Sequence, residues 1–157
     1  MTWTAPRTWT DGETVTAVEM NAHVRDNLKA IGDAWAAYTP TFTNLTLGAS
    51  TVTGNYMQAG KLVHTRGSIT LGTGFAITGT VQASLPVSAI ATAVPIGSAG
   101  LFDTSATDYR WWNAVVTPGG TATVIFSDPA NARVNATVPW TWAVGDVIRW
   151  QIAYESA

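Results

Sequence analysis

Turn-forming residues interrupt the chain so often after residue 39 that it cannot form long helices there. Glycine and proline mark turns because glycine accepts a positive φ and proline removes a backbone N–H donor. The stretches between them are short and rich in Val, Ile and Thr, which favours a sandwich or barrel of short strands. The turn signals are Gly48, Gly60, 72–74, Pro86, Gly97, Gly100, 118–120, 128–129, Pro139 and 145–146.

Nine segments between these turns are predicted as strands. The clearest is 147–154, where Ile148, Trp150, Ile152 and Tyr154 share one face and polar or small residues share the other. Gly54 is predicted as a β-bulge. This number of strands is typical of a jelly roll or a related sandwich. The predicted strands are 41–47, 52–57, 62–71, 75–85, 93–102, 109–117, 122–126, 135–138 and 147–154.

One α-helix, over about residues 17–31, precedes these strands. Thr16 and Glu19 have the spacing of a capping box, and Gly32 is predicted as a left-handed C-terminal cap. The sequence thus predicts a mainly β protein: residues 1–38 form an N-terminal arm and helix, and 39–157 form an antiparallel, jelly-roll-like β-sandwich. An apolar stripe runs along the helix at Met20, Val24, Leu28 and Ile31.

The stripe needs a partner, because a helix of about 15 residues is marginal alone in water. Three partners fit the pattern: the chain's own sheet, sister helices in a three-helix bundle, or another protein. The arm ahead of the helix carries Trp3 and Trp9. These either fold back onto the chain's own helix or sheet, or insert into a neighbouring subunit. We expect Trp3, Trp9 and the stripe to form an oligomer or particle interface.

Composition and charge exclude several classes of partner. Only 11% of the 157 residues are charged, the formal net charge is −2, and there is no cysteine. The surplus acids lie in residues 1–33, and the remainder is neutral. We expect no nucleic-acid binding and no membrane binding, because no basic stripe or polybasic segment is present. The lack of cysteine leaves no disulfide framework and is compatible with folding in a reducing cytoplasm.

No residue pattern indicates catalysis, a metal site or a cofactor. The nucleophile-elbow motif, the P-loop and the dinucleotide fingerprint are absent. Glu19 and His23 stand four residues apart on the helix, a spacing more typical of a helix-face contact than of a metal site. Asp103 and Asp108 flank a loop and are candidates for a glycan-degrading carboxylate pair or for calcium ligands together with carbonyl oxygens. We expect them to be turn residues.

Tryptophans are the better candidates for binding. Trp111 and Trp112 are adjacent in a predicted strand, which places them on opposite faces, one in the core and one outside. Trp140 and Trp142 bracket a short loop. Exposed tryptophans form apolar platforms for sugar rings or partner proteins. The alternative for all four is packing in the core or between subunits.

The segment 9–28, WTDGETVTAVEMNAHVRDNL, resembles an opening that recurs in virion proteins of tailed bacteriophages, especially phages of actinobacteria. Residues 38–48 and 54–67 resemble the β domains that follow it there, and 84–87, 142–148 and 154–155 are similar to their later strands. The resemblance covers most of the chain. It implies a virion surface component, commonly trimeric, and is shared by capsid and tail proteins.

The sequence therefore favours a non-enzymatic structural protein of the virion, assembled in the host cytoplasm and bound to other virion proteins. The short chain favours a trimeric capsid decoration or accessory protein held by its N-terminal segment. The alternative is a tail-tip or tail-fibre protein that recognises a host cell-surface glycan through Trp111, Trp112, Trp140 or Trp142. A glycan-degrading enzyme using Asp103 or Asp108 is the third hypothesis.

Overall fold

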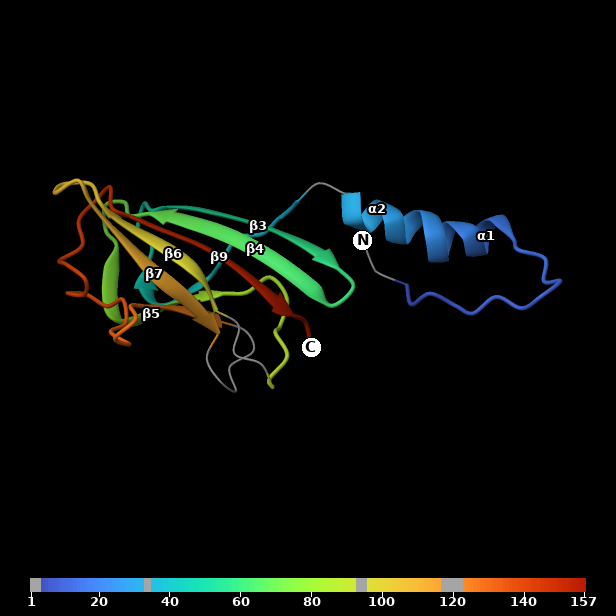
Figure 1. The fold of residues 1–157 in the computed structure, drawn as a ribbon. Helices are drawn as coiled ribbons and strands as arrows, with labels where there is room; N and C mark the ends of the chain where they lie inside the picture. Colours follow the sequence, from blue (N-terminus) through green and yellow to red (C-terminus); the bar gives the residue numbers. More distant parts are fainter. Residues whose placement is uncertain (1–3, 33–34, 93–95, 117–122) are drawn as a thin grey trace.

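The computed structural model describes residues 4–32, 35–92, 96–116 and 123–157 and shows a helical segment extending from one end of a β domain (Figure 1). The helical segment comprises α1 (Ala17–Met20), the π-helical turn η1 (Asn21–Arg25) and α2 (Asp26–Gly32). The strands are β1 (Ala36–Ala37), β2 (Phe42–Thr46), β3 (Thr51–Ala59), β4 (Leu62–Thr70), β5 (Ala76–Ser84), β6 (Ile96–Asp103), β7 (Asp108–Val116), β8 (Thr123–Ser127) and β9 (Val147–Glu155).

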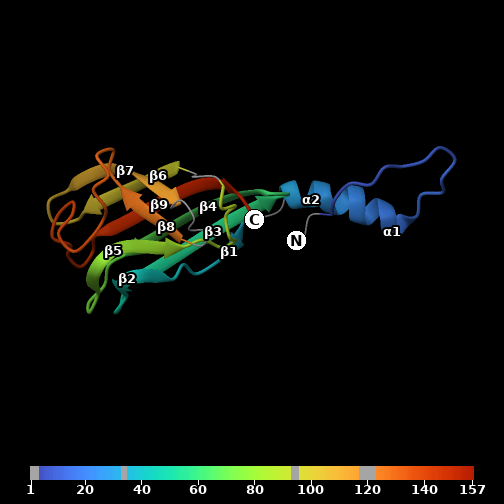
Figure 2. The ribbon, with the colours of Figure 1, turned by 90° about the horizontal axis from the view of Figure 1, so that it is seen from below.

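These nine strands form one antiparallel sheet in the order β1-β3-β4-β9-β6-β7-β8-β5-β2. β9 comes last in the chain but lies inside the sheet, between β4 and β6. The sheet curls until its two halves face each other (Figures 1 and 2). Trp150 of β9 contacts two rings from the opposite half, Phe126 at 5.4 Å and Phe42 at 6.1 Å between ring centroids. The predicted mainly β, sandwich-like fold with an N-terminal helix is confirmed.

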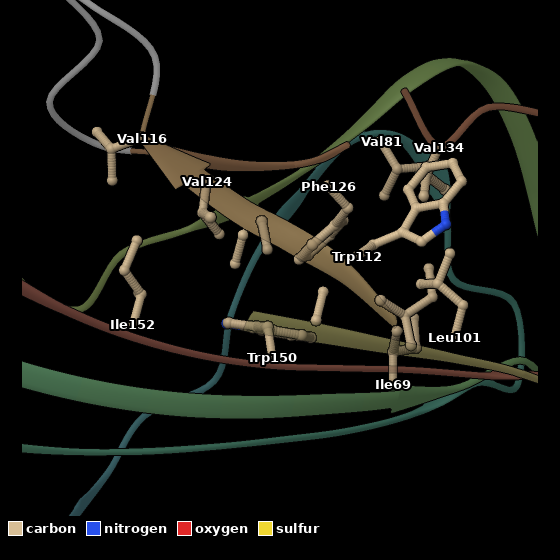
Figure 3. Close-up of a cluster of buried hydrophobic side chains, with 14 of the residues drawn as sticks. Ile69, Val81, Leu101, Trp112, Val116, Val124, Phe126, Val134, Trp150 and Ile152 are labelled. Carbon is tan, nitrogen blue, oxygen red and sulfur yellow. The ribbon is translucent and has the colours of Figure 1, made fainter. Parts of the chain in front are cut away.

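The core fills the space between these halves. On β9 the predicted alternation holds: Ile148, Trp150, Ile152 and Tyr154 are buried, while the residues between them on the other face are mostly exposed. Figure 3 shows Trp150 and Phe126 among aliphatic side chains from several strands. Removal of this apolar surface from water is the main term that stabilises the β domain.

The glycine at position 54 serves close packing and not a bulge. β3 pairs with β4 through Gly54 and Gly67 without a register shift, so the predicted bulge is wrong. A Cβ at Gly54 would lie 2.7 Å from Tyr38 Cε1 and 2.8 Å from Pro40 Cδ, closer than side chains can approach. The register shift lies instead in β2, at Asn44, which has a φ of 60°.

The predicted strand over 135–138 is also wrong. Asn135 and Val138 exchange backbone hydrogen bonds of 3.2 and 3.4 Å, which makes the segment a tight turn. Pro139 has no N–H with which to continue a ladder. The Trp142 indole N–H donates to the Asn135 carbonyl oxygen at 2.9 Å and holds the turn against the core. Positions 93–95, 117 and 122 of other predicted strands lie outside the described residues.

The helix begins as predicted and ends differently. The Thr16 hydroxyl accepts a hydrogen bond from the Glu19 N–H at 3.3 Å, and the Thr16 N–H donates to Glu19 Oε2 at 2.9 Å, so the capping box is confirmed. The predicted left-handed cap at Gly32 is wrong. Gly32 is the last residue of α2, and its φ is not positive, because the helix continues through it.

Candidate functional site

The predicted stripe lies on the open face of the helix. Met20, Val24, Leu28 and Ile31 are between 37% and 65% exposed. The stripe therefore does not pack on the chain's own sheet, which was one of the three partners that the sequence left open. An apolar row that a short helix leaves in water is typical of an association surface.

A face of the helix next to the stripe is covered by the chain's own arm. The Thr4 N–H donates to Asn27 Oδ1 at 3.0 Å, and Asn27 Nδ2 donates back to the Thr4 carbonyl oxygen at 2.8 Å. One turn earlier, His23 Nδ1 lies 3.1 Å from the Ala5 carbonyl oxygen. The arm thus runs back along the helix, and Asn27 is buried, whereas the stripe residues are exposed.

Charge and aromatic contacts fix the far end of the arm. Arg7 forms ion pairs with Glu13 and Glu19, and its guanidinium lies 4.6 Å from the Trp9 ring centroid. The Trp9 ring meets His23 edge-on, with ring centroids 6.3 Å apart. The observed arrangement is therefore the arm folded onto its own helix, and not an arm free to insert elsewhere. Trp3 lies outside the described residues.

Two carboxylates of this contact have lowered pKa values. The Thr10 N–H is the largest cause at Glu13 and the Thr16 N–H is the largest at Glu19, and Arg7 contributes at both. Each hydrogen bond stabilises the ionised carboxylate, so the pKa falls below the ordinary 4.5. The arm contact is therefore strongest while both groups are charged.

The π-helical turn was not predicted. It lies at residues 21–25, directly after Met20, and contains Val24 of the stripe. A π-turn is wider than an α-turn, and such turns are rare and frequent at functional sites. In a regular α-helix, residues four apart drift around the axis, because a turn takes 3.6 residues. This offset is only about 40°, so Met20 and Val24 share a side of the helix with or without the π-turn.

The four tryptophans of the β domain have different positions. Trp111 is 76% exposed and Trp112 is buried, so the predicted placement on opposite faces is confirmed. Trp142 is buried, and Trp140 is partly buried against it, with ring centroids 5.3 Å apart. Burial makes Trp112 and Trp142 unavailable to a ligand. Trp111 is the member of this set that a ligand can reach.

Asp103 and Asp108 stabilise the hairpin between β6 and β7. Asp103 Oδ1 accepts hydrogen bonds from the Ser105 hydroxyl at 2.7 Å and from the N–H groups of Ser105 and Ala106 at 2.9 and 3.0 Å. These bonds lower the pKa of Asp103. Asp108 forms a 2.8 Å ion pair with Arg110. Both carboxylates have the contacts of turn residues.

The described residues contain no cluster of three or more metal-ligating side chains. Glu19 is bound to Thr16 and Arg7, and His23 to the arm, as expected for helix-face contacts. The described part of the chain also has no helix that is long and apolar enough to cross a membrane.

The residues around Trp111 form a second candidate surface that the sequence reading missed. Arg149 faces outward from β9 and lines a hollow of about 260 Å³ together with Tyr109 and Trp111. The alternation of β9 places Arg149 on the face opposite Trp150, and this signal was available in the sequence. The pairing of β9 with β6, and of β6 with β7, brings Arg149 close to Trp111. This pairing could not be predicted from the sequence.

Comparison of the chain with models of known protein families, with curated proteins and with solved structures finds no match.

Proposed function

We propose that this chain is a non-enzymatic structural protein of a phage virion, a trimeric decoration or accessory protein held to the particle by its N-terminal segment. The observation that carries the proposal is the exposed stripe of Met20, Val24, Leu28 and Ile31 on a helix whose neighbouring polar face is already covered by its own arm. The resemblance of segment 9–28 to phage virion proteins supplies the biological setting.

Burial of the stripe would contribute favourably to self-association, and the entropy lost on association opposes it. Full burial of one aliphatic side chain stabilises by about 1.5–3 kcal/mol. The four stripe residues are already partly buried in the single chain, so each would gain only part of this stabilisation. Association also costs translational and rotational entropy. A row one residue wide suits a symmetric bundle, in which every copy offers the same face.

The test is the mass of the full chain in solution. We expect sedimentation equilibrium to give three times the 16.6 kDa of one chain. The double variant Met20→Asp with Val24→Asp is expected to give a single chain with an intact β domain. Val144→Asp is the matched control, since Val144 is 56% exposed in the β domain. A monomeric unaltered chain, or a trimeric double variant, contradicts self-association; normal incorporation of the double variant into particles contradicts attachment.

A second candidate role is recognition of a host cell-surface glycan by a tail-tip or tail-fibre protein. The observation that favours it is the 76% exposed Trp111, which lies on the β domain and not on the helix. The two roles therefore use separate surfaces. A glycan array probed with the full chain and with Trp111→Ala tests this role. We expect binding that the substitution abolishes, and an array without hits contradicts it.

A further inference from the structure

The outer face of the sheet carries a row of exposed polar and aromatic side chains. Two ladders cross β4, β9, β6 and β7 on this face: Ser68–Arg149–Gly100–Trp111 and Arg66–Gln151–Ser98–Asn113. Arg66, Arg149, Gln151, Ser98 and Trp111 are all exposed. Gln151 Nε2 donates to Ser98 Oγ at 3.2 Å, while Arg66 and Arg149 have no carboxylate partner among the described residues. An exposed tryptophan beside such arginines is the composition of a binding surface and not of a solvated face.

Aromatic rings form one end of this row. The Tyr109 and Trp111 ring centroids are 5.2 Å apart, and Phe102 lies 5.3 Å from Tyr109. A Cβ at Gly100 would be 3.3 Å from Tyr109 Cε1 and 3.6 Å from Trp111 Cζ3, so both rings lie close above the Gly100 backbone. The glycine thus lets the rings lie over the sheet. The result is a supported aromatic shelf, which suits the C–H face of a sugar ring.

Adjoining hollows continue from this shelf across the sheet. The hollow beside Trp111, of about 260 Å³, shares Arg149 with a second one of about 260 Å³ that Arg66 and Asn55 also line. It shares Ser98 and Gln151 with a third, of about 220 Å³, next to His64. Each is smaller than the roughly 300–1,000 Å³ typical of a site for a whole drug-sized ligand. Their size and succession fit consecutive sugar units of a chain.

Two arginines on this face indicate that the ligand carries negative charge. Neither Arg66 nor Arg149 has a carboxylate partner among the described residues, whereas Arg7, Arg25 and Arg110 each do. Arg66 is held in place by its guanidinium, 4.5 Å from the Trp35 ring centroid. A guanidinium offers a planar pair of N–H donors that matches a carboxylate or phosphate. Two such groups beside an aromatic shelf favour an anionic ligand that also contains rings.

We propose that this face binds an acidic glycan: one sugar ring lies on Tyr109 and Trp111, and Arg149 holds the carboxylate or phosphate of that unit or the next. Arg66 holds the following anionic group. The inference rests on the second proposed role, since it names the ligand class for glycan recognition. It does not depend on the helix or on trimer formation, because every residue involved belongs to the β domain or to Trp35 at its edge.

The test compares probes that differ in one property. Polygalacturonate supplies rings with carboxylates, fully methyl-esterified polygalacturonate supplies the same rings without charge, and polyglutamate supplies carboxylates without rings. Phosphomannan supplies rings with phosphates and distinguishes phosphate from carboxylate as the source of charge. We expect titration calorimetry of the full chain to show binding to polygalacturonate or phosphomannan, weakened about tenfold or more when charge or ring is missing.

Variants locate the site. Trp111→Ala and Arg149→Ala are each expected to weaken binding about tenfold or more without changing the near-ultraviolet circular dichroism of the core. Arg133→Ala is the matched control, since Arg133 is an exposed arginine in the loop after β8. It is expected to bind like the unaltered chain.

Each of the other possible results of these titrations would contradict a different part of the proposal. Equal binding of the esterified polymer, lost in Trp111→Ala, overturns the acidic ligand and keeps glycan recognition. Equal binding of polyglutamate, or equal loss in Arg133→Ala, means attraction by charge alone and overturns the site. No binding to any probe overturns both the acidic glycan and this recognition surface, while the trimer and its test remain unaffected.

Discussion

The helical segment and the β domain place their apolar side chains in opposite ways. In the sheet, β9 turns Ile148, Trp150 and Ile152 inward and leaves polar residues such as Arg149 and Gln151 outside. On the helix, the polar Asn27 is buried under the arm and the apolar stripe is exposed. The apolar face of the sheet is thus buried within one chain. The helix, in contrast, has a polar face covered by the arm and an apolar face exposed to solvent. This difference is the reason for assigning the proposed association to the helix and not to the sheet.

The largest expected effect tests this contrast directly. Trp150→Ala removes a side chain that is 3% exposed and is expected to lower the free energy of unfolding by about 3–5 kcal/mol. Leu28→Ala removes a 65% exposed side chain and is expected to change it by less than about 0.5 kcal/mol in the monomer. Urea unfolding at low protein concentration measures both. A comparable loss in Leu28→Ala would mean that the helix belongs to the core.

A smaller effect is expected from the helix cap. Thr16→Ala removes the hydroxyl that accepts from the Glu19 N–H and is expected to destabilise the helix by about 1 kcal/mol. Hydrogen exchange should show faster exchange of the amides of residues 17–25 and unchanged exchange of β4 and β9. Faster exchange in both regions would show that the helix and the sheet unfold together, against the contrast drawn above.

The smallest expected effects separate the two regions by pH. Burial raises the pKa of Tyr154, whose hydroxyl donates to the Val87 carbonyl oxygen at 2.8 Å, above the ordinary 10.0. The folded chain keeps this proton where the unfolded chain loses it, so the contribution is complete below pH 10 and is lost as the pH rises further. We expect the Tm of the β domain to fall above pH 10, and less steeply in Tyr154→Phe.

The arm is expected to respond at the acid end. The pKa values of Glu13 and Glu19 lie below 4.5, so their contribution is complete above that pH and is lost as the pH falls through the lowered values. The NMR resonance of the Trp9 indole N–H should then report release of the arm from His23 while β-domain circular dichroism persists. Simultaneous loss of both signals would contradict independent regions.

Local patterns in the sequence were enough for the elements that depend on neighbouring residues. The alternation of β9 and the Thr16–Glu19 capping box are examples, because period and cap spacing are set within a few residues. The role of Gly54 was not visible, since it depends on Tyr38 and Pro40 from another part of the chain. The π-turn was not visible either, because no residue type marks it.

The candidate sites divide in the same way. The exposed stripe followed from helical periodicity, and the contrast between Trp111 and Trp112 followed from strand alternation. The packing of the arm on the polar face of the helix could not be predicted from periodicity. Thr4 and Asn27 are 23 residues apart and meet through hydrogen bonds. The row containing Arg66, Arg149 and Trp111 needs the strand order of the sheet, which periodicity within single strands does not supply.

The position of β9 inside the sheet has a consequence for synthesis. Until residues 147–155 have been made, β4 and β6 each lack the neighbour that joins them, so two unpaired strand edges are open to other chains. A nascent chain can form the β3–β4 and β6–β7 hairpins early, but it cannot close the core between them. Folding of the β domain is therefore expected to finish only after β9 has been synthesised. Aggregation during expression should be most sensitive to changes in that strand.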